Sequence, residues 1–498
     1  MSTNITGYTK SALIIGFILL VSFSFLTSCT QNSLSTHVYT TDNKSLKAKQ
    51  SGLANEDLNA NQLAVGAERY SKYLPLLEGK RVSLVVNQSS LVRNDLVRDD
   101  LVRDDLVRNN QITGHSGTIK ANQPYQHLVD ALLQRNVDLV SIMSPEHGFR
   151  GDKGAGEKVN SDIDAKTGLP IYSLYGATKK PTTAMLENTD IIVFDIQDVG
   201  VRFYTYLSTL HYVMEAAFAQ GIQVVVLDRP NPNGRYVDGP VLKPAFSSFI
   251  GMHPIPVLHG MTLGELAQMI VGERWLDIEA TNYNQAKLTV VPVEDYERTA
   301  HYSLPVAPSP NLPNDLSIQL YPTLCFFEGT DVSIGRGTNF PFQLIGHPNI
   351  EFGGSQILVK ANSAAPHPKH ENTLLNAHVF TRADLIDSEY MDLENSSLKL
   401  QNREASPISG LKIETLIDAY SRFSEYNRIA TASGSSTEKF FTRPEFFDKL
   451  AGTDALRIQI QTGKTSAEIR QSWQKSLSAF REKRKPYLLY EDIERRQE

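Results

Sequence analysis

The chain has 498 residues, of which 41% are hydrophobic and 21% charged, as in an ordinary globular protein with a core of its own. The formal net charge is −6 and no long basic stripe occurs, so nucleic acid is a poor candidate partner. The two cysteines, Cys29 and Cys325, are too few for a disulfide framework.

Residues 1–28 have the pattern of a bacterial lipoprotein signal peptide. Lys10 precedes an apolar run over residues 11–25 that is short for a membrane span, and LTSC at 26–29 resembles a lipobox. We therefore expect Cys29 to carry acyl chains that anchor the protein to a membrane of the cell envelope. Because Thr30 follows Cys29, we expect the outer membrane or its periplasmic face if the host has two membranes. An ordinary signal peptide with a chance cysteine is the alternative.

A polar segment and a tandem repeat precede most of the globular sequence. Residues 29–65 have no periodicity and predict a flexible tether. Residues 79–87 (GKRVSLVVN) predict a buried strand, and residues 91–110 form four copies of a five-residue unit: LVRND, LVRDD, LVRDD and LVRNN. A period of five fits neither helix nor strand. One interpretation is an interaction module. We favour an insertion tolerated in a surface loop, because lengthening a loop adds little closure entropy.

Apolar strands then alternate with helices up to about residue 300. Strands are expected at 137–143, 170–175, 190–196, 222–227 and 288–293, and helices at 125–134, at 203–220 and from Thr262, where TLGE forms a capping box. This alternation predicts an α/β fold, with a Rossmann-like domain over residues 66–300 whose parallel sheet is covered on both faces. No GxGxxG motif occurs, so a dinucleotide cofactor has no support.

Polar segments follow four of these strands. They are NQSS (87–90), SPEHGFRG (144–151), DIQDVGVRFYTY (195–206) and LDRPNPNG (227–234). Because ligands of open α/β sheets bind beyond the carboxyl ends of the strands, we expect the functional crevice at this edge.

Residues 301–498 predict a second, smaller α/β domain. It contains APSPNLP (307–313), the glycine-rich segment EGTDVSIGRGT (328–338), and a helix at 466–484 that begins with a capping box, Thr465 and Glu468. We expect the active-site cleft between the two domains, a usual place for a ligand site.

Nine segments, in order, resemble the exo-β-N-acetylmuramidase family, glycoside hydrolase family 171, formerly a family of unknown function. They are SPEHGFRG, AGE (155–157), TGLPIYSLYG, VFDIQDVGVRFYTY, VLDRPNPNG, HGMTLGELA, PSPNLP, EGTDVSIGRGT and PFQLIG. The resemblance runs from about residue 79 to Tyr490 and excludes the tether and the repeat. It implies a Rossmann-like and a smaller domain with the site between them. It also implies release of N-acetylmuramic acid from the non-reducing end of peptidoglycan fragments, in cell-wall turnover and recycling. Asp331 departs from the family, which more often has Asn there.

Glycoside hydrolysis requires an acid for the leaving oxygen and usually a second carboxylate as nucleophile or base. Glu146, in SPEHGFRG, is our candidate acid. His147 is expected to position it or to contact the sugar, with a structural histidine as the alternative. The candidates for the second catalytic role are Asp195 and Asp198, and Glu157, Asp228 and Glu328 also remain open. If the 2-acetamido group of the substrate attacks the anomeric carbon, a carboxylate that orients this amide suffices.

The lactyl carboxylate of muramic acid requires a guanidinium group, which can bind both carboxylate oxygens at once. Arg150, Arg202 and Arg336 are the candidates, and Tyr204 and Tyr206 are expected to contact the sugar unless they belong to the core. The candidate binding residues together are Asn87, Arg150, Arg202, Tyr204, Asp228, Arg229, Asn311, Glu328 and Arg336.

No cofactor or metal is expected, and two other functional classes remain as alternatives. One is a metal-dependent phosphoesterase, with a divalent ion held by Glu146, His147, Asp195, Asp198 and Asp228. Against it, the histidines are scattered and lack the spacing of zinc sites. The other is a non-catalytic lipoprotein that binds the cell wall.

Overall fold

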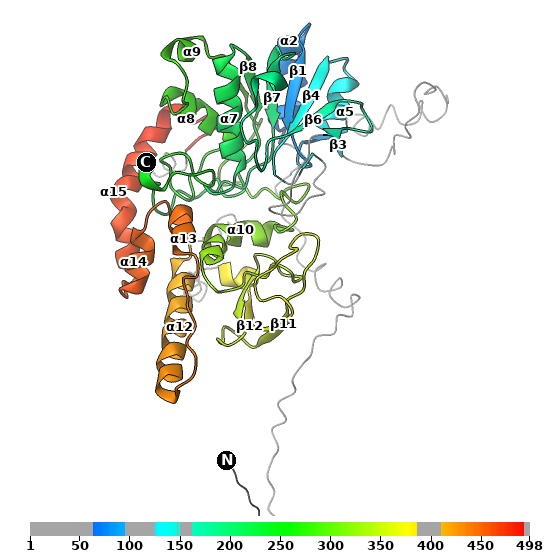
Figure 1. Ribbon diagram of the computed structural model, residues 1–498. Helices are drawn as coiled ribbons and strands as arrows, with labels where there is room; N and C mark the ends of the chain where they lie inside the picture. Colours follow the sequence, from blue (N-terminus) through cyan, green and yellow to red (C-terminus); the bar gives the residue numbers. More distant parts are fainter. Residues whose placement is uncertain (1–62, 95–124, 147, 150–161, 386–409, 493–498) are drawn as a thin grey trace, which may run out of the picture. The chain divides into compact units, whose positions relative to one another are not determined.

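The computed structural model describes residues 63–94, 125–146, 148–149, 162–385 and 410–492, all within one compact unit, Ala54–Glu498. Its centre is a seven-stranded sheet in which every neighbouring pair is parallel except β5 and β6 at one edge (Figure 1). In spatial order the strands are β5 (Asp162–Ile163), β6 (Pro170–Ser173), β4 (Leu139–Ser144), β1 (Val82–Val86), β7 (Ile191–Asp195), β8 (Gln223–Leu227) and β9 (Leu288–Val291). The predicted α/β class and parallel sheet are confirmed.

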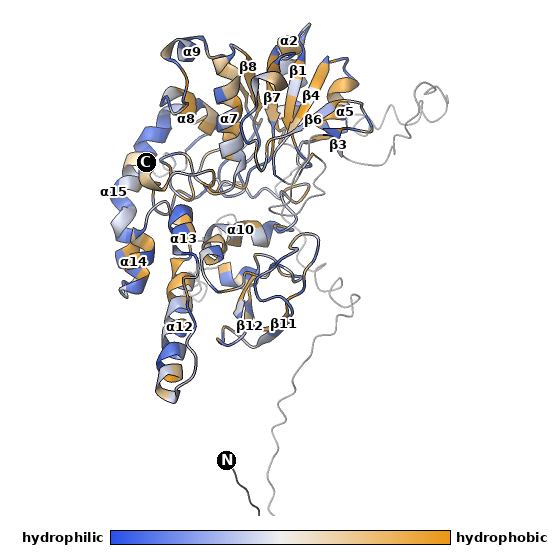
Figure 2. Ribbon diagram, viewed as in Figure 1, coloured by the Kyte–Doolittle hydropathy of each residue, from blue (hydrophilic) through white to orange (hydrophobic). Residues whose placement is uncertain are grey.

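Both faces of the sheet are buried. Successive side chains of a strand point to opposite faces, so each strand contributes to two cores. Within β1, Val85 belongs to the core that includes helices α7 and α8, and Leu84 belongs to the core that includes helices α2 and α5. Figure 2 shows the hydrophobic colouring along central strands such as β4 and β7. The bounds of the four helices are Tyr206–Ala219 for α7, Leu263–Gly272 for α8, Tyr70–Leu77 for α2 and Leu128–Leu133 for α5.

The first copy of the five-residue repeat belongs to the fold. Leu91–Arg93 is strand β2, which pairs antiparallel with β3 (Tyr125–His127). Val92 is fully buried, and Arg93 forms a salt bridge with Glu68 at 2.5 Å. The expectation that an inserted loop begins at residue 91 is therefore wrong, because sequence periodicity cannot show that one copy pairs with a strand about 30 residues away. The remaining copies lie outside the described residues.

Two predicted helices begin later than expected. The helix expected at 125–134 begins at Leu128, because the three residues before it pair with β2. The helix expected at 203–220 begins at Tyr206, because the preceding residues form a bridge and a turn: Val201 pairs with Leu258, and Tyr204 N donates to Val201 O. In both places, contacts with distant residues determine where the helix begins, although the local sequence favours an earlier start.

After residue 300 the structure contains a three-stranded antiparallel sheet and several helices. The sheet has the order β10 (Leu344–His347), β12 (Leu374–Val379) and β11 (Ser355–Leu358). The helices are α10 (Asp315–Leu324), α12 (Ile413–Ser433), α13 (Pro444–Ala451), α14 (Ala455–Gln461) and α15 (Ser466–Arg484). The predicted capping box at the start of α15 is confirmed.

The last described residues return to the first sheet. Tyr490 donates its hydroxyl to Asp228 Oδ2 at 2.6 Å, and Leu489 N donates to Glu265 Oε1 at 2.7 Å. The domain boundary expected near residue 300 remains a prediction. The shorter helical segments are η2 (Gly66–Glu68), α6 (Thr183–Leu186), η3 (Pro244–Phe246), α9 (Ala280–Gln285), η4 (Cys325–Gly329), η5 (Arg382–Leu385) and η6 (Lys485–Tyr487).

We predict that Val92→Ala lowers the free energy of unfolding by about 2 kcal/mol, because it removes two methyl groups from a buried site. Urea denaturation of the purified protein measures this loss. Val97→Ala, at the equivalent position of the second copy, is the sequence-matched control and is expected to change stability less. Equal losses in the two variants would contradict the expectation that Val92 contributes more to stability than Val97.

Candidate active site

Parallel pairing places the carboxyl ends of four strands at one edge of the sheet. β4, β1, β7 and β8 lie side by side in that order. Shortly after their last residues come Glu146, Asn87, Asp198 and Asp228, respectively. The four polar segments expected to meet at one edge therefore do so.

Glu146 is a partly buried carboxyl group with hydroxyl groups around it. Thr205, the residue before α7, donates its hydroxyl to Glu146 Oε2 at 3.3 Å. Tyr175 follows β6 and also interacts with this carboxyl, since burial and then the charge of Glu146 raise the pKa of Tyr175. Burial and Glu146 likewise raise the pKa of Tyr206. Glu146 thus lies where a bound substrate could exchange a proton with it.

Three of the other candidates cannot be placed. His147, Arg150 and Glu157 lie outside the described residues, so their expected roles remain predictions.

Asp195 and Arg229 are buried and bind each other. Arg229 Nε donates to Asp195 Oδ1 at 2.6 Å, and Arg229 Nη2 donates to Asp195 Oδ2 at 2.9 Å. Removing one partner of such a pair leaves the other charge buried and uncompensated. The geometry favours a structural role for this pair over a catalytic aspartate and a separate binding arginine.

Asp198 is a buried carboxyl group without a cationic partner among the described residues. Its Oδ1 accepts the backbone N–H of Gly200 at 2.6 Å, whereas its Oδ2 has no hydrogen-bond partner within the described structure. Burial raises the pKa of Asp198 to about 7, against the opposing effect of the backbone hydrogen bonds. The turn that holds it is tight: Gly200 has φ of +76°, and a Cβ there would lie 1.9 Å from Asn231 Oδ1.

Asn87, at the end of β1, is also buried and only partly satisfied. Its Oδ1 accepts hydrogen bonds from Ser89 N at 2.9 Å and Ser89 Oγ at 2.6 Å. Its Nδ2 has no hydrogen-bond partner in the described part of the chain. The Asn87 side chain nevertheless lies close enough to Tyr206 to oppose the rise in the pKa of that tyrosine.

One backbone carbonyl ties the second half of the chain to this edge. Gln88 Nε2, Tyr204 OH and Tyr206 OH all donate to Pro308 O, at 2.9, 3.0 and 3.3 Å. Asn311, three residues on, donates to Ala364 O at 2.8 Å. Tyr204 and Tyr206 are buried. Their side chains and the loop from Pro308 to Asn311 therefore form part of this edge of the sheet.

Glu328 and Arg336 form a partly exposed ion pair. Arg336 Nη2 lies 2.7 Å from Glu328 Oε1, and the two side chains are 27% and 25% exposed. The Arg336 guanidinium lies over the Phe342 ring, 4.8 Å from its centroid. Phe342 contacts Tyr321 at 5.0 Å, and Tyr321 contacts Tyr204 at 5.7 Å, so aromatic rings connect the ion pair to the sheet edge.

Asp331, which lies between Glu328 and Arg336, belongs to the one group of three side chains with metal-ligand atoms close together among the described residues. The ligand atoms of Asp331, His347 and His370 lie within 4.8 Å of one another. His347 Nδ1 accepts the N–H of Asn349, so its Nε2 carries the proton that Asp331 Oδ2 accepts at 3.1 Å. A metal-bound histidine instead donates from its second nitrogen. The group therefore fits a hydrogen-bonded support for this segment better than a metal centre.

Arg202 and Asp228 already have several partners each. Arg202 Nη1 donates to Pro240 O and Ile255 O, both at 2.7 Å, and its Nη2 donates to Leu450 O at 2.8 Å. Asp228 accepts from Thr262 Oγ1 at 2.6 Å, from Gly264 N and from Tyr490 OH. Burial raises the pKa of Asp228 to about 6. The geometry favours a structural role for both residues, although both were expected to bind substrate.

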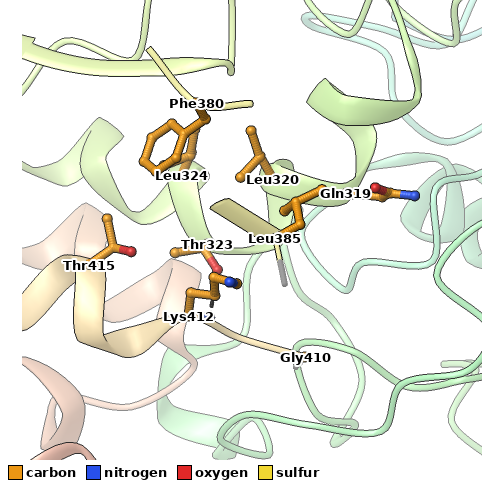
Figure 3. A pocket seen from close by; sticks show the side chains of 9 residues that line it. All are labelled: Gln319, Leu320, Thr323, Leu324, Phe380, Leu385, Gly410, Lys412 and Thr415. Carbon is orange, nitrogen blue, oxygen red and sulfur yellow. Dashed lines mark hydrogen bonds between the residues drawn. The ribbon is translucent and has the colours of Figure 1, made fainter. Parts of the chain in front are cut away.

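A small pocket lies elsewhere, among α10, η5 and α12 (Figure 3). Leu320, Leu324, Phe380 and Leu385 give it an apolar lining, with Lys412 beside them. None of the candidate site residues lines it.

Comparisons with known proteins identify the family. A family model described as exo-beta-N-acetylmuramidase NamZ, N-terminal, matches residues 111–316, and its C-terminal counterpart matches residues 319–490. The chain belongs to the exo-β-N-acetylmuramidase NamZ family. The peptidoglycan beta-N-acetylmuramidase NamZ of Bacillus subtilis (strain 168) is 39% identical over 386 residues, covering 74% of this chain and 84% of that protein. The resemblance inferred from the nine segments is confirmed.

Two solved structures from Bacteroides fragilis NCTC 9343, both of DUF1343 family proteins, have the same fold. One is 37% identical with a TM-score of 0.66. The other is 26% identical with a TM-score of 0.62. Each comparison covers 86% of this chain and 99% of the other chain.

Three contributors to the NamZ-family site were missed by sequence reasoning. Tyr175 and Thr205 contact Glu146, and Gln88 helps to hold Pro308. Each lies in a segment already expected near the strand ends or in the family resemblance. The segments indicated the region, but only the folded chain shows which side chain turns toward the acid.

We predict that the stability difference between Asp198→Asn and wild type depends on pH. Burial raises the pKa of Asp198 from 3.8 to about 7, so the carboxyl group opposes folding once it ionises. This destabilisation is absent below about pH 4 and grows until about pH 7, to an order of 4 kcal/mol. Urea denaturation at the two ends of this range should show that the free energy of unfolding of Asp198→Asn rises relative to that of wild type as the pH rises.

Asp190→Asn is the matched control, because Asp190 is paired with Arg81, which lowers its pKa, so the difference between this variant and wild type should change little over this pH range. A constant difference between Asp198→Asn and wild type across the range would contradict an unpaired buried carboxyl group at residue 198.

Proposed function

We propose that this protein is an exo-acting β-N-acetylmuramidase that releases N-acetylmuramic acid from the non-reducing end of peptidoglycan fragments, in cell-wall turnover and recycling. Membership of the NamZ family and the activity in the name of the Bacillus subtilis relative support this function. The structural observation that carries it is the position of Glu146, a partly open carboxyl group beyond a central strand, in contact with Thr205 and Tyr175.

We assign the general acid to Glu146. It protonates the glycosidic oxygen, while the hydroxyls of Thr205 and Tyr175 fix the orientation of its carboxyl group. Of the other acids at the edge, Asp195 is bound to Arg229 and Asp228 accepts three hydrogen bonds, which leaves neither free to move protons. A metal-dependent phosphoesterase would need these same carboxylates as ligands.

Glu146→Gln should keep the fold and lower turnover of a muramic acid–glucosamine disaccharide by at least about a hundredfold, the low end of general acid–base assistance. Glu425→Gln, which removes an exposed carboxylate on α12, is the control and should retain activity. The exo mode adds a requirement: a chain with a blocked non-reducing end should not be cut by the wild-type enzyme. A folded Glu146→Gln variant with near-normal turnover would contradict the assignment of Glu146 as the general acid.

The lactyl carboxylate of the substrate is expected to bind Arg336. Arg150 lies outside the described residues, and the two terminal nitrogens of Arg202 donate to three carbonyls. Arg336 is partly exposed, and its bonds to Glu328 use Nε and Nη2. Its remaining nitrogen is therefore available to a ligand carboxylate, while the Phe342 ring holds the guanidinium in place.

Arg336→Met should reduce the preference for chromogenic N-acetylmuramides over N-acetylglucosaminides, by an amount corresponding to about 2–5 kcal/mol. The assay compares both substrates in each variant. Arg202→Met is the matched control: it should lower the melting temperature, because three carbonyls lose their donors, and leave the preference of the folded fraction unchanged. Equal rates of the wild type on both sugars would exclude recognition of the carboxylate.

We also propose that the mature protein is anchored to an envelope membrane through lipid on Cys29, with the outer membrane or its periplasmic face as the site in a host with two membranes. The lipobox-like LTSC supports this proposal. Cys29 lies outside the described residues, and within the described ones no helix is long and apolar enough to cross a membrane.

Cys29→Ala should move the expressed protein from the membrane fraction to the soluble fraction, because a protein without acyl chains lacks their membrane affinity. Detergent phase partitioning of the two forms measures the difference, with Cys325→Ala as the control for loss of a thiol. A variant that remains in the detergent phase would contradict the lipid anchor.

A further inference from the structure

Five buried side-chain polar atoms without hydrogen-bond partners among the described residues lie at the carboxyl ends of adjacent strands. They are Ser144 Oγ at the end of β4, Asn87 Nδ2 and Gln88 Oε1 after β1, and Gln197 Oε1 and Asp198 Oδ2 after β7. Asn87 and Ser144 are fully buried and Asp198 is 8% exposed. Buried polar atoms are nearly always paired in native proteins, so such a group at the expected site edge points to a ligand.

Tyr206 lies close to Glu146 and also to the side chains of Asn87 and Asp198. Burial raises the pKa of Tyr206, the charges of Glu146 and Asp198 raise it further, and the Asn87 side chain opposes the rise. All three side chains therefore lie close to one hydroxyl group. Tyr206 donates this hydroxyl to Pro308 O at 3.3 Å, so it is fixed in place.

Asp198 is suited to binding an N–H group. Its Oδ1 is held by the backbone N–H of Gly200, and no cation among the described residues neutralises the carboxyl. Its Oδ2 is buried and has no hydrogen-bond partner among those residues, and its charge acts on Tyr204 and Tyr206. Asn87 presents the complementary group: its Oδ1 is held by Ser89, and its Nδ2, on the side chain that acts on the Tyr206 hydroxyl, has no hydrogen-bond partner among the described residues.

We propose that Asp198 and Asn87 bind the 2-acetamido group of N-acetylmuramic acid, and that this group, not a protein side chain, is the nucleophile. The inference rests on the proposed muramidase function. An amide offers one N–H and one carbonyl oxygen. Asp198 Oδ2 accepts from this N–H, and Asn87 Nδ2 donates to this oxygen.

In the first step the acetamido oxygen forms a bond to the anomeric carbon. The bond from this carbon to the glycosidic oxygen breaks, the oxygen keeps the electron pair, and Glu146 gives it a proton. Asp198 takes the amide proton, so the intermediate is a neutral oxazoline. In the second step a water oxygen attacks the anomeric carbon and Glu146 takes a proton from the water. The bond between the anomeric carbon and the oxazoline oxygen breaks, its electron pair returns to the amide, and Asp198 returns the proton to the amide nitrogen. The product keeps the β configuration.

The test uses the wild-type protein and 4-nitrophenyl β-muramides whose 2-acyl group is acetyl, fluoroacetyl, difluoroacetyl or trifluoroacetyl. Fluorine withdraws electrons from the amide oxygen, so the rate should fall at every step of the series. Proton NMR should show the β-anomer as the first product. Rates independent of fluorination, or the α-anomer as the first product, would overturn the proposal while leaving the muramidase function intact. No turnover of any muramide or disaccharide would instead refute the proposed function.

A second measurement separates orientation of the amide from a merely structural effect. Asp198→Asn should lower turnover by about a hundredfold or more. It should also weaken binding of a muramic acid thiazoline, a stable mimic of the oxazoline, relative to wild type. Glu146→Gln, which leaves the amide contacts in place, should retain more affinity for the thiazoline than Asp198→Asn does. If Asp198→Asn does not fold, the fluorinated series and thiazoline binding by wild type still decide the question.

Discussion

The parallel pairing of β1 with both β4 and β7 is the constraint on which the site depends. All three strands run in one direction, so the residues after them reach the same edge of the sheet. Their central residues are buried on both faces, which fixes the register, because shifting a strand by one residue would exchange the two core faces. Glu146, Asn87 and Asp198 are positioned by this register, although they lie in loops.

The hydrogen-bond partners of the buried polar groups separate scaffold from site. Asp195 with Arg229 and Asp228 with its three donors are satisfied within the protein, and the two terminal nitrogens of Arg202 donate to three carbonyls. Such groups stabilise the arrangement of loops and gain little from a ligand. Within the described part of the chain, Asp198 and Asn87 each keep one buried atom without a hydrogen-bond partner. An unpaired buried polar atom is destabilising, and binding a ligand that pairs it recovers this free energy.

The second half of the chain contributes to this edge of the sheet through Pro308 and through the segment that carries Arg336. Pro308 O accepts three hydrogen bonds from the first half, and the aromatic rings between Tyr204 and Phe342 continue to Arg336. Lys369 stabilises the segment that carries Glu328 and Arg336, since its ammonium group donates to the carbonyls of Phe327, Thr330 and Val332. A polar substrate group bound at Arg336 would thus lie on a rigidly supported segment of the second half.

The sequence by itself determined the elements with strong periodicity. The apolar runs at 190–196 and 222–227 became β7 and β8, and the capping boxes at Thr262 and Thr465 began α8 and α15, because these signals depend on neighbouring residues only. The motifs also determined the family, and they predicted the edge of the sheet at which polar residues gather. The pairing of the first LVR copy with residues 125–127 could not be predicted, because antiparallel pairing is a contact between distant segments. The same reason applies to individual side chains. The sequence offered Asp195, Asp198 and Asp228 as equivalent carboxylates, and three arginines as equivalent guanidiniums. Only the tertiary structure decided which of them already have partners, because a charge is neutralised by whatever the fold places within about 3 Å of it, at any separation along the chain.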